Sequence, residues 1–323
     1  MAHWSILKEV GFVPQPEKGL PVLMIRSPGQ SVPPFADIQR QQDRVTGPRI
    51  GAVQYLNTRP LIYGLSGELI YDLPSRLADR LAGGDLDVAL IPTIELFQGL
   101  AGNGAAGGQR GYRIISRACI ACRGPVMSVR LFFRTRPERV RTIAVDEGSR
   151  TSVAVCRILL AKRFGLSPSL ETLPLNETID QTSADAVLLI GDRAIGPTGG
   201  GFQAVWDLGD EWFRSTGLPF VFAVWAARPG VDADKLGRLL DAARDRGEAN
   251  LAAIAAAEAA GHGLTVPQCL DYLRENLHYD LGPLERRALQ LFYREACQLG
   301  LAPSSRDLAG AFVSPASLAP GSA

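Results

Sequence analysis

The chain has 323 residues, of which 46% are hydrophobic and 21% are charged, a composition typical of a globular protein. Its 34 Lys and Arg residues and 33 Asp and Glu residues give a formal net charge of +1. This balance excludes a broad electrostatic attraction to nucleic acid or to an anionic membrane, so neither is expected as a partner. At roughly 150 residues per domain, the length predicts about two domains.

Short apolar runs alternate with helical patterns from about residue 48 onward. Strands are expected at residues 49–56, 69–73, 87–91, 112–122, 128–134, 142–145, 186–190 and 220–226. Helices are expected after Pro60, over residues 75–84, after residue 93, from about residue 149, over residues 206–216, and almost throughout residues 232–299. This alternation predicts an α/β fold with parallel or mixed sheets that are covered by helices on both faces.

The two ends of the chain differ from the rest. Residues 1–47 are rich in Pro and Gln and lack periodicity, which predicts a poorly ordered N-terminal extension. Residues 302–323 predict a flexible tail, and the Gly- and Ala-rich residues 100–108 predict a surface loop. The sequence shows neither a secretory leader pattern nor an apolar run of about 18 residues, so we expect a cytoplasmic protein.

The five cysteines do not form a recognisable disulfide or metal-binding pattern. Cys119 and Cys122 form a single CxxC, and the three histidines, His3, His262 and His278, lie far from it in the sequence. A zinc site of this kind needs a second ligand pair. We therefore expect buried thiols and no metal or other cofactor.

Three strand-to-helix junctions carry polar side chains. In open α/β sheets, ligands bind at the carboxyl ends of strands, close to helix N-termini. The junctions place Asn57, Thr93 and the group Ser149, Arg150, Thr151 and Ser152 at such positions. Three hydroxyls and a guanidinium at one helix start exceed what an N-cap needs, and favour binding of a carboxylate or phosphate.

Two further residues are candidates for substrate binding, and a purely structural role is equally consistent with the sequence at each of them. Ser128 follows a Gly-Pro-Val turn, and it either lines the cleft or serves as an ordinary strand residue. Asp192 follows a buried strand, and its alternative role is an ion pair with a local arginine. No phosphate-binding glycine motif follows a strand, which argues against a nucleotide. No histidine lies at a junction, so the base of any reaction is a carboxylate, water or the substrate itself.

Six segments in order resemble one enzyme family. They are IGAVQYLNTRPL (50–61), DLDVALIPTIELF (85–97), GPVMSVRL (124–131), DEGSRTS (146–152), IGDRA (190–194) and DLGDEWFRSTGLPFVFAVW (207–225). Together they resemble the chorismate dehydratases of the futalosine route to menaquinone, over roughly residues 48–300. The last segment is the most specific of the six.

The resemblance implies a type II periplasmic-binding-protein-like fold, with a ligand cleft between two α/β lobes. Lobe 1 is expected to comprise residues 48–133 and 221–301, and lobe 2 residues 134–220. The resemblance also implies a hydro-lyase that removes water from chorismate to give 3-[(1-carboxyvinyl)oxy]benzoate, without a cofactor.

Residue roles follow from matching positions in the family's motifs. Asn57 is expected to be catalytic and to orient the substrate at the reacting carbons. Thr93 lies where many relatives carry serine, and is expected to supply a hydroxyl. Ser149, Thr151 and Ser152 match the family's SRTS and are expected to bind one carboxylate, with Arg150 inside the same motif. Ser128 and Asp192 complete the candidate substrate-binding set.

Three alternatives remain open from the sequence. One is the pathway's later cyclase, of the 1,4-dihydroxy-6-naphthoate synthase type, which shares the fold. Another is a binding protein for a small organic anion, without enzymatic activity. A LysR-type effector domain is the third, although no N-terminal helix-turn-helix is evident. The sequence does not indicate an oligomeric state.

Overall fold

The computed structural model of the chain describes residues 47–100, 111–196 and 200–304. The predicted N-terminal extension, the Gly- and Ala-rich loop and nearly all of the predicted tail lie outside the described residues. Both sheets described below belong to one unit, which begins at Pro48.

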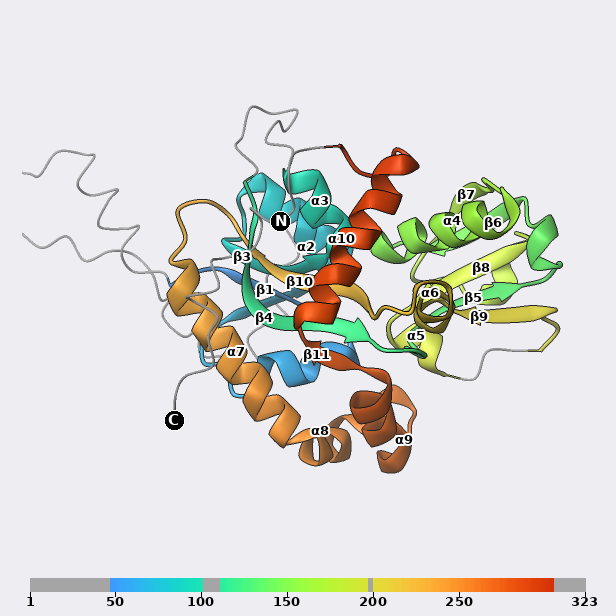
Figure 1. The fold of residues 1–323 in the computed structure, drawn as a ribbon. Coiled ribbons are helices and arrows are strands. Elements are labelled where there is room, and N and C mark those ends of the chain that lie inside the picture. Colours follow the sequence, from blue (N-terminus) through green and yellow to red (C-terminus); the bar gives the residue numbers. More distant parts are fainter. Residues whose placement is uncertain (1–46, 101–110, 197–199, 305–323) are drawn as a thin grey trace, which may run out of the picture. The chain divides into compact units, whose positions relative to one another are not determined.

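The first sheet has six strands in the order β11-β4-β10-β3-β1-β2 (Figure 1). The strands are β1 (Ile50–Val53), β2 (Leu69–Asp72), β3 (Val88–Pro92), β4 (Arg113–Cys122), β10 (Phe220–Ala227) and β11 (His278–Asp280). β1 pairs in parallel with β2 and β3, whereas β10 runs antiparallel to both β3 and β4. β10 is buried along its whole length because it lies inside the sheet.

The second sheet has five strands in the order β7-β6-β8-β5-β9. They are β5 (Val129–Phe133), β6 (Thr142–Asp146), β7 (Ser169–Leu173), β8 (Ala186–Ile190) and β9 (Ala204–Asp207). β6 pairs in parallel with β7 and β8, and β5 runs antiparallel to β8 and β9. Along β8, Leu188 packs in the main core and Val187 in a smaller cluster. Burial on both faces explains why this strand is apolar throughout.

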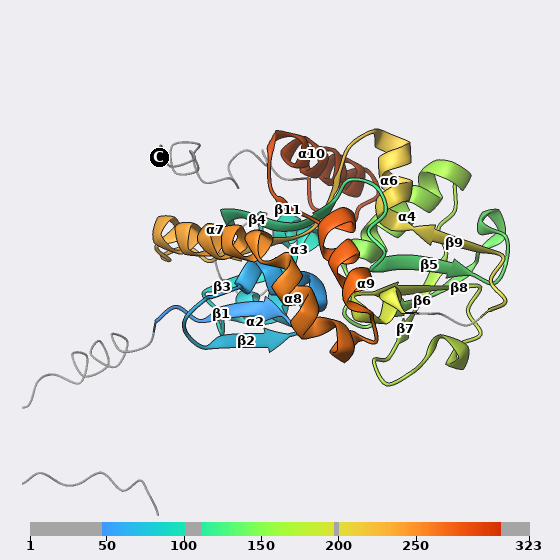
Figure 2. The ribbon, with the colours of Figure 1, turned by 90° about the horizontal axis from the view of Figure 1, so that it is seen from below.

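Helices cover the sheets (Figure 1, Figure 2). They are α2 (Pro74–Gly83), α3 (Thr93–Leu100), α4 (Thr151–Phe164), α5 (Asp192–Ile195), α6 (Leu208–Thr216), α7 (Ala233–Ala249), α8 (Leu251–Glu258), α9 (Val266–Asp271) and α10 (Pro283–Gln298). Short 3-10 helices cover Leu56–Ile62, Pro137–Arg139, Ile179–Gln181 and Ala259–His262, and a π-helix covers Tyr272–Asn276. α2 begins at Pro74 and ends before Gly84, whose φ of 91° terminates it.

The structure differs from the expected elements at a few places. The helix expected after Pro60 is a 3-10 helix that already begins at Leu56. Pro60 lies inside it, where an α-helix would lose a hydrogen bond. The helix expected over residues 206–216 begins at Leu208, because Asp207 ends β9 and caps α6. β7, β9 and β11 were not expected, and β11 interrupts the helical C-terminal region with three residues.

The strands divide between the sheets earlier than the sequence indicated. β4 ends at Cys122 in the first sheet, and β5 lies entirely in the second sheet. The division therefore falls before Val129 and not after residue 133. The chain returns at Phe220, which pairs with Cys122 in the first sheet.

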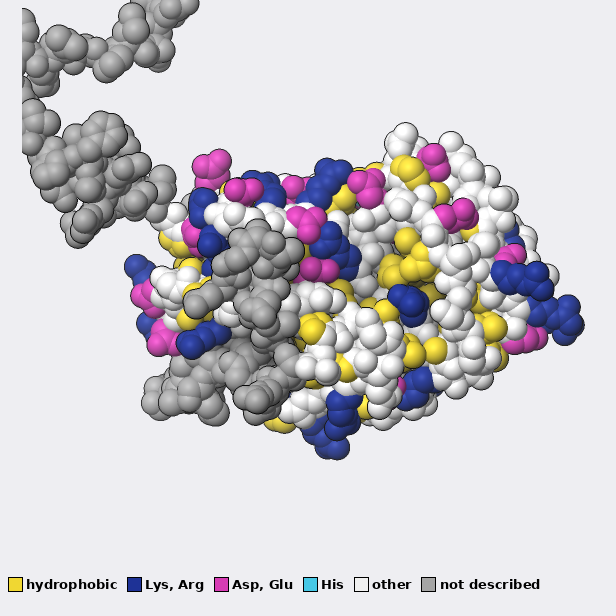
Figure 3. All heavy atoms as spheres, turned by 90° about the horizontal axis from the view of Figure 1, so that it is seen from above, with side chains coloured by type: hydrophobic (Ala, Val, Ile, Leu, Met, Phe, Trp, Pro, Cys, Tyr) yellow, Lys and Arg dark blue, Asp and Glu magenta, His cyan; other side chains and the backbone are white. Residues whose placement is uncertain are grey.

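Charged side chains of both signs lie on the surface. On the face shown in Figure 3, basic and acidic side chains are interspersed, as a formal net charge of +1 predicts. Within the described ranges, no helix combines the length and the apolar character that crossing a membrane requires.

Candidate functional site

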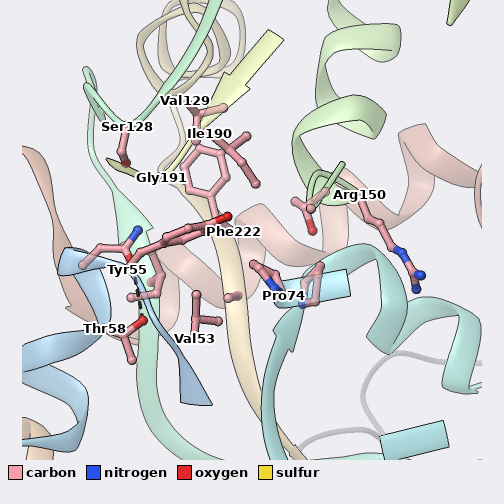
Figure 4. Close-up of a pocket in the computed structure, with 16 residues that line it drawn as sticks. Val53, Tyr55, Thr58, Pro74, Ser128, Val129, Arg150, Ile190, Gly191 and Phe222 are labelled. Carbon is pink, nitrogen blue, oxygen red and sulfur yellow. Dashed lines mark hydrogen bonds between the residues drawn. The ribbon is translucent and has the colours of Figure 1, made fainter. Parts of the chain in front are cut away.

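A pocket lies where the carboxyl ends of parallel strands from both sheets meet (Figure 4). It contains about 530 Å³ of space between atoms, including the part open to solvent. From the first sheet come Tyr55, Asn57, Thr58 and Phe222, and from the second come Ser128, Gly148, Thr151 and Gly191. Val53, Pro74, Pro92, Ile120, Val129 and Ile190 supply apolar lining. Apolar walls with a few convergent polar groups are typical of a site for a small organic ligand.

Two aromatic rings, those of Tyr55 and Phe222, lie in the pocket (Figure 4). Burial raises the pKa of the Tyr55 phenol, and the nearby carboxylates of Asp146 and Asp192 raise it further. The Tyr55 hydroxyl therefore stays protonated at neutral pH and can donate a hydrogen bond. Neither ring was singled out from the sequence, because a Tyr or Phe in a strand-like run is indistinguishable from a core residue.

The start of α4 offers unused hydrogen-bond donors. No side chain caps this helix, which begins at Thr151. The Ser149 hydroxyl is buried and makes no hydrogen bond, although buried polar groups are normally paired. Thr151 lines the pocket, and Ser152 is buried beside it. Unpaired backbone N–H groups, a free hydroxyl and the positive end of the helix dipole together favour an anion.

The side chain of Arg150, unlike those of its neighbours, is directed away from the pocket. It lines the pocket, but its guanidinium points away from it (Figure 4). Its terminal nitrogens lie 2.8 Å from Asp79 on α2 and 3.3 Å from Glu95 on α3. The structure thus assigns the charge of Arg150 to ion pairs that join α4 to the helices of the first sheet.

The hydroxyl of Thr93 also makes a hydrogen bond within the protein. Thr93 is completely buried, and its Oγ1 donates to the carbonyl of Val221, 2.9 Å away. The next residue, Ile94, donates its N–H to Thr151 Oγ1 at 3.2 Å. Thr93 is not among the residues that line the pocket, so its contribution is to hold the start of α3 against β10 and α4.

Asn57 and Ser128 reach the pocket from opposite sheets. Asn57 lies in the 3-10 helix after β1, and Thr58 Oγ1 donates to its Oδ1 at 3.3 Å. This bond uses Oδ1 as an acceptor, so Nδ2 is the donor group of this side chain. Ser128 is almost fully buried, and its side chain projects into the pocket (Figure 4).

Asp207 holds the turn that carries Ser128. Its carboxylate accepts the N–H of Val126 at 2.9 Å and that of Met127 at 2.7 Å, in addition to capping α6. Met127 adopts a φ of 60°, an unfavourable conformation for a residue with a side chain. Sequence reasoning missed this role, because an Asp before a helix already has a sufficient explanation as an N-cap.

Asp192 lies beside the pocket and not in its lining. Its Oδ1 accepts the N–H of Leu56 at 3.1 Å, and its Oδ2 lies 3.2 Å from Nδ1 of His262. Burial raises the pKa of the Asp192 carboxyl, while the Leu56 N–H and His262 oppose the rise. Asp192 therefore connects the second sheet to the first and to the C-terminal helices, and it does not pair with the neighbouring Arg193.

Arg193 instead pairs with Asp146, the last residue of β6. Its Nη1 lies 2.9 Å from Asp146 Oδ2, and the Asp146 side chain is fully buried. Asp146 Oδ1 accepts the N–H of Gly148 at 3.2 Å, and its carbonyl accepts that of Ser149 at 2.9 Å. The ion pair thereby supports the turn that brings Gly148 to the pocket; Ser149, the next residue, is buried beside it and is not among the lining residues.

The cysteines lie apart from this site. Cys119, Cys122, Cys156 and Cys269 are buried free thiols, and Cys297 is partly exposed. Burial raises the pKa of the Cys156 thiol to about 12. In the part of the chain that the structure describes, no cluster of His, Cys, Asp or Glu side chains could hold a metal ion.

Gly191 lets the backbone lie closer to the Tyr55 ring than a residue with a side chain would allow. Its φ is 58°, and a Cβ at this position would lie 2.7 Å from the Tyr55 ring. We expect Gly191→Ala to lower the free energy of unfolding by about 2–4 kcal/mol, through backbone strain and displacement of Tyr55. Urea denaturation measures this, with Gly196→Ala as the control, because a Cβ there meets nothing within 4 Å. Equal losses in the two variants would contradict the assigned packing.

Comparison with known proteins agrees with this architecture. Residues 48–298 match a family described as menaquinone biosynthesis. A chorismate dehydratase of Thermus thermophilus is 32% identical over 275 residues, which cover 79% of this chain and 96% of that protein.

Solved structures are similar in fold at lower identity. A protein from Archaeoglobus fulgidus has a TM-score of 0.64 at 18% identity, covering 79% of this chain and 98% of its own. The periplasmic aliphatic sulphonate binding protein of Escherichia coli has a TM-score of 0.55 at 16% identity, covering 82% and 91%. These similarities confirm the expected periplasmic-binding-protein-like fold.

Proposed function

The chain belongs to the menaquinone-biosynthesis family, and from that premise we propose that it is a chorismate dehydratase. The observation that carries this proposal most directly is the similarity to the Thermus thermophilus enzyme across nearly all of that enzyme's length. We assign the activity to the pocket between the sheets. We further propose that the reaction belongs to the futalosine route, and we place it in the cytoplasm.

The pocket suits the shape and charge of chorismate. This substrate carries two carboxylates and a six-membered ring. The unpaired Ser149 hydroxyl, with Thr151, Ser152 and the uncapped start of α4, would hold one carboxylate. The rings of Tyr55 and Phe222 would lie against the substrate ring. A neutral set of donors that is already in place binds the dianion through fixed dipoles.

The reaction itself requires few catalytic groups from the protein. The hydroxyl at C4 leaves, the proton at C3 is lost, and the ring becomes aromatic, giving 3-[(1-carboxyvinyl)oxy]benzoate and water. Asn57 Nδ2 and the Ser128 hydroxyl would donate hydrogen bonds and orient the reacting carbons. The described residues that line the pocket contribute hydroxyls, an amide and the ion-paired Arg150. We therefore propose that a carboxylate of chorismate accepts the C3 proton.

A small-anion binding protein is the second candidate function. The fold is similar to that of the Escherichia coli sulphonate binding protein, and Asp192, Arg150 and Thr151 join the two sheets around the pocket. Such contacts would close a binding site around a ligand whether or not a reaction follows.

One assay separates the two functions. The purified chain is mixed with chorismate, and the products are followed by chromatography with mass detection and absorbance. We expect loss of one water and the appearance of an aromatic chromophore, both absent from a heat-denatured control. Recovery of unchanged chorismate with a folded protein that is stabilised against heat by chorismate would favour binding alone, and would overturn the dehydratase.

A further inference from the structure

The carboxylate of Asp192 caps the start of the 3-10 helix that carries Asn57. This helix begins at Leu56, and the side chain of the residue before it, Tyr55, makes no capping hydrogen bond. The first N–H groups of a helix have no partner inside the helix, so they need one from elsewhere. The N–H of Leu56 donates to Asp192 Oδ1 at 3.1 Å, a side chain 136 positions further along the chain. A residue that follows a strand of the second sheet therefore caps a helix of the first.

Further contacts lead from Asp192 back to the same 3-10 helix. The other carboxylate oxygen, Oδ2, lies 3.2 Å from Nδ1 of His262, the last residue of the 3-10 helix after α8. His262 Nε2 lies 3.5 Å from Oε2 of Glu258. Glu258 Oε1 lies 3.1 Å from Nε of Arg59, as an ion pair without the alignment of a hydrogen bond. Arg59 belongs to the helix that Asp192 caps, so the contacts begin and end on one short helix.

These contacts lie directly beside the pocket. Gly191 lines the pocket and Asp192 follows it, while Asn57 lines the pocket and follows Leu56. The hydrogen bond between Asp192 and Leu56 therefore joins the two sides of the pocket next to the amide that we assign to the reacting carbons. Neither Asp192 nor His262 is among the lining residues. Any effect of the two on the reaction passes through a neighbour.

We propose that Asp192 and His262 are positioning residues for the dehydration, acting through Asn57. This inference rests on the proposed function. Leu56 and Arg59 are held on either side of Asn57, which fixes the place of its amide relative to the substrate. His262 Nδ1 donates to Asp192 Oδ2, since a carboxylate only accepts hydrogen bonds, and this contact keeps Oδ1 directed at Leu56. A misplacement of about 1 Å at a reacting centre can lower a rate about a hundredfold, so such support affects the chemical step.

Removal of the Asp192 carboxylate should slow the chemical step more than it weakens binding. We expect Asp192→Ala to lower kcat for chorismate about 10–100-fold, the effect of one lost hydrogen bond to a charged group, and to change KM by less than about threefold. Asp192→Asn keeps an oxygen that accepts the N–H of Leu56, and a neutral His262 can accept from the new amide through its other tautomer. This variant should keep kcat within about threefold of the wild type.

A second pair of variants tests His262. His262→Ala removes the donor to Asp192 and should lower kcat about three- to tenfold, the effect of one ordinary hydrogen bond. His262→Asn places an amide N–H near the position of the imidazole Nδ1 and should bring kcat back to within about twofold of the wild type. A loss that is the same in both variants would contradict the assigned role of His262.

Asp185 provides a matched control at the other end of β8. It directly precedes this strand, and its Oδ2 accepts the N–H of Arg141 at 2.8 Å and that of Thr142 at 3.2 Å. Both partners lie at the start of β6, at the edge of the second sheet opposite the pocket. Asp185→Ala should lower the melting temperature and leave kcat unchanged. A loss of kcat specific to Asp192→Ala then cannot come from removing an aspartate that accepts backbone N–H groups in general.

A double-mutant cycle tests the route through Asn57. In an Asn57→Ala background, Asp192→Ala should lower kcat by less than about threefold, because the side chain that it positions is gone. Unchanged kcat in Asp192→Ala, a rise in KM alone, an equal loss in both backgrounds, or an equal loss in Asp185→Ala would each overturn the inference while leaving the dehydratase intact. If Asp192→Ala does not fold, His262→Ala carries the same test, and full kcat in that variant overturns the inference. A wild-type protein without turnover would overturn the proposed function and, with it, this inference.

Discussion

Replacement of Asn57 by alanine is expected to lower kcat for chorismate by about 10²–10³-fold, the range found when a preorganised donor at a reacting centre is removed. Asn57 lines the pocket, and Thr58 fixes its Oδ1 as an acceptor at 3.3 Å. Its Nδ2 is therefore the donor that Asn57 would offer to the substrate. Steady-state kinetics with chorismate measure the loss.

The variant Asn57→Asp distinguishes the loss of the hydrogen-bond donor from a change in the size of the side chain. The aspartate has nearly the same size, but at neutral pH it only accepts hydrogen bonds and repels a dianion. It should be at least as inactive as Asn57→Ala. Asn250→Ala is the control: Asn250 Nδ2 donates to the carbonyl of Arg246 at an exposed helix junction, so activity should be retained. An active Asn57→Asp variant would show that Asn57 does not act as a donor.

The parts of the site that the sequence predicted are those that local patterns control. Parallel strands end at the same edge of a sheet, so Asn57 after β1 and Thr151 after β6 could be expected beside a ligand. A run of hydroxyls before a long helix pointed to Ser149 and Ser152 for the same reason, and both are buried next to pocket-lining residues without lining the pocket themselves. The order of strands within each sheet, and the sheet to which β5 belongs, were not predictable in this way.

The parts that the sequence did not reveal depend on distant partners. Asp192 was predicted to bind substrate, with an ion pair to a local arginine as the alternative, yet its partner, His262, lies 70 positions further along the chain. The ion pairs of Arg150 with Asp79 and Glu95 depend on how α2 and α3 are placed against the start of α4. Side-chain direction is decided by such tertiary contacts and has no signature in sequence spacing.

The largest effect on stability is expected at Arg193, the partner of the buried carboxylate of Asp146. Arg193→Met keeps an unbranched apolar stem but removes the guanidinium 2.9 Å from Asp146 Oδ2. Breaking a buried ion pair from one side leaves an uncompensated charge, which costs about 3–5 kcal/mol. We expect a loss of this size near neutral pH, measured as the free energy of unfolding in urea. Arg214→Met is the control, since Arg214 is 69% exposed in its pair with Asp210, and such pairs contribute at most about 1 kcal/mol.

The loss should depend on pH in a direction fixed by Asp146. Burial raises the pKa of this carboxyl above its ordinary value of 3.8, while Arg193 opposes the rise. Without Arg193 the folded-state pKa is higher still. A carboxyl whose pKa is raised by folding binds its proton more tightly in the folded state, so stability falls as pH rises through the raised pKa. The difference between Arg193→Met and the wild type should therefore be smaller at about pH 5 than at about pH 7.5.

Asp146→Asn combined with Arg193→Met tests whether charge is the cause. Asparagine still accepts the N–H of Gly148, now 3.2 Å from Asp146 Oδ1, and carries no charge that needs a partner. The double variant should recover most of the stability lost by Arg193→Met and show little dependence on pH. If both variants are equally unstable at every pH, the loss comes from the packing of Arg193 and from its bond to the carbonyl of Glu177. If the pH dependence disappears with the carboxylate, the charge of Asp146 is the cause of the loss, and the ion pair stabilises the turn of Gly148 and Ser149 after β6.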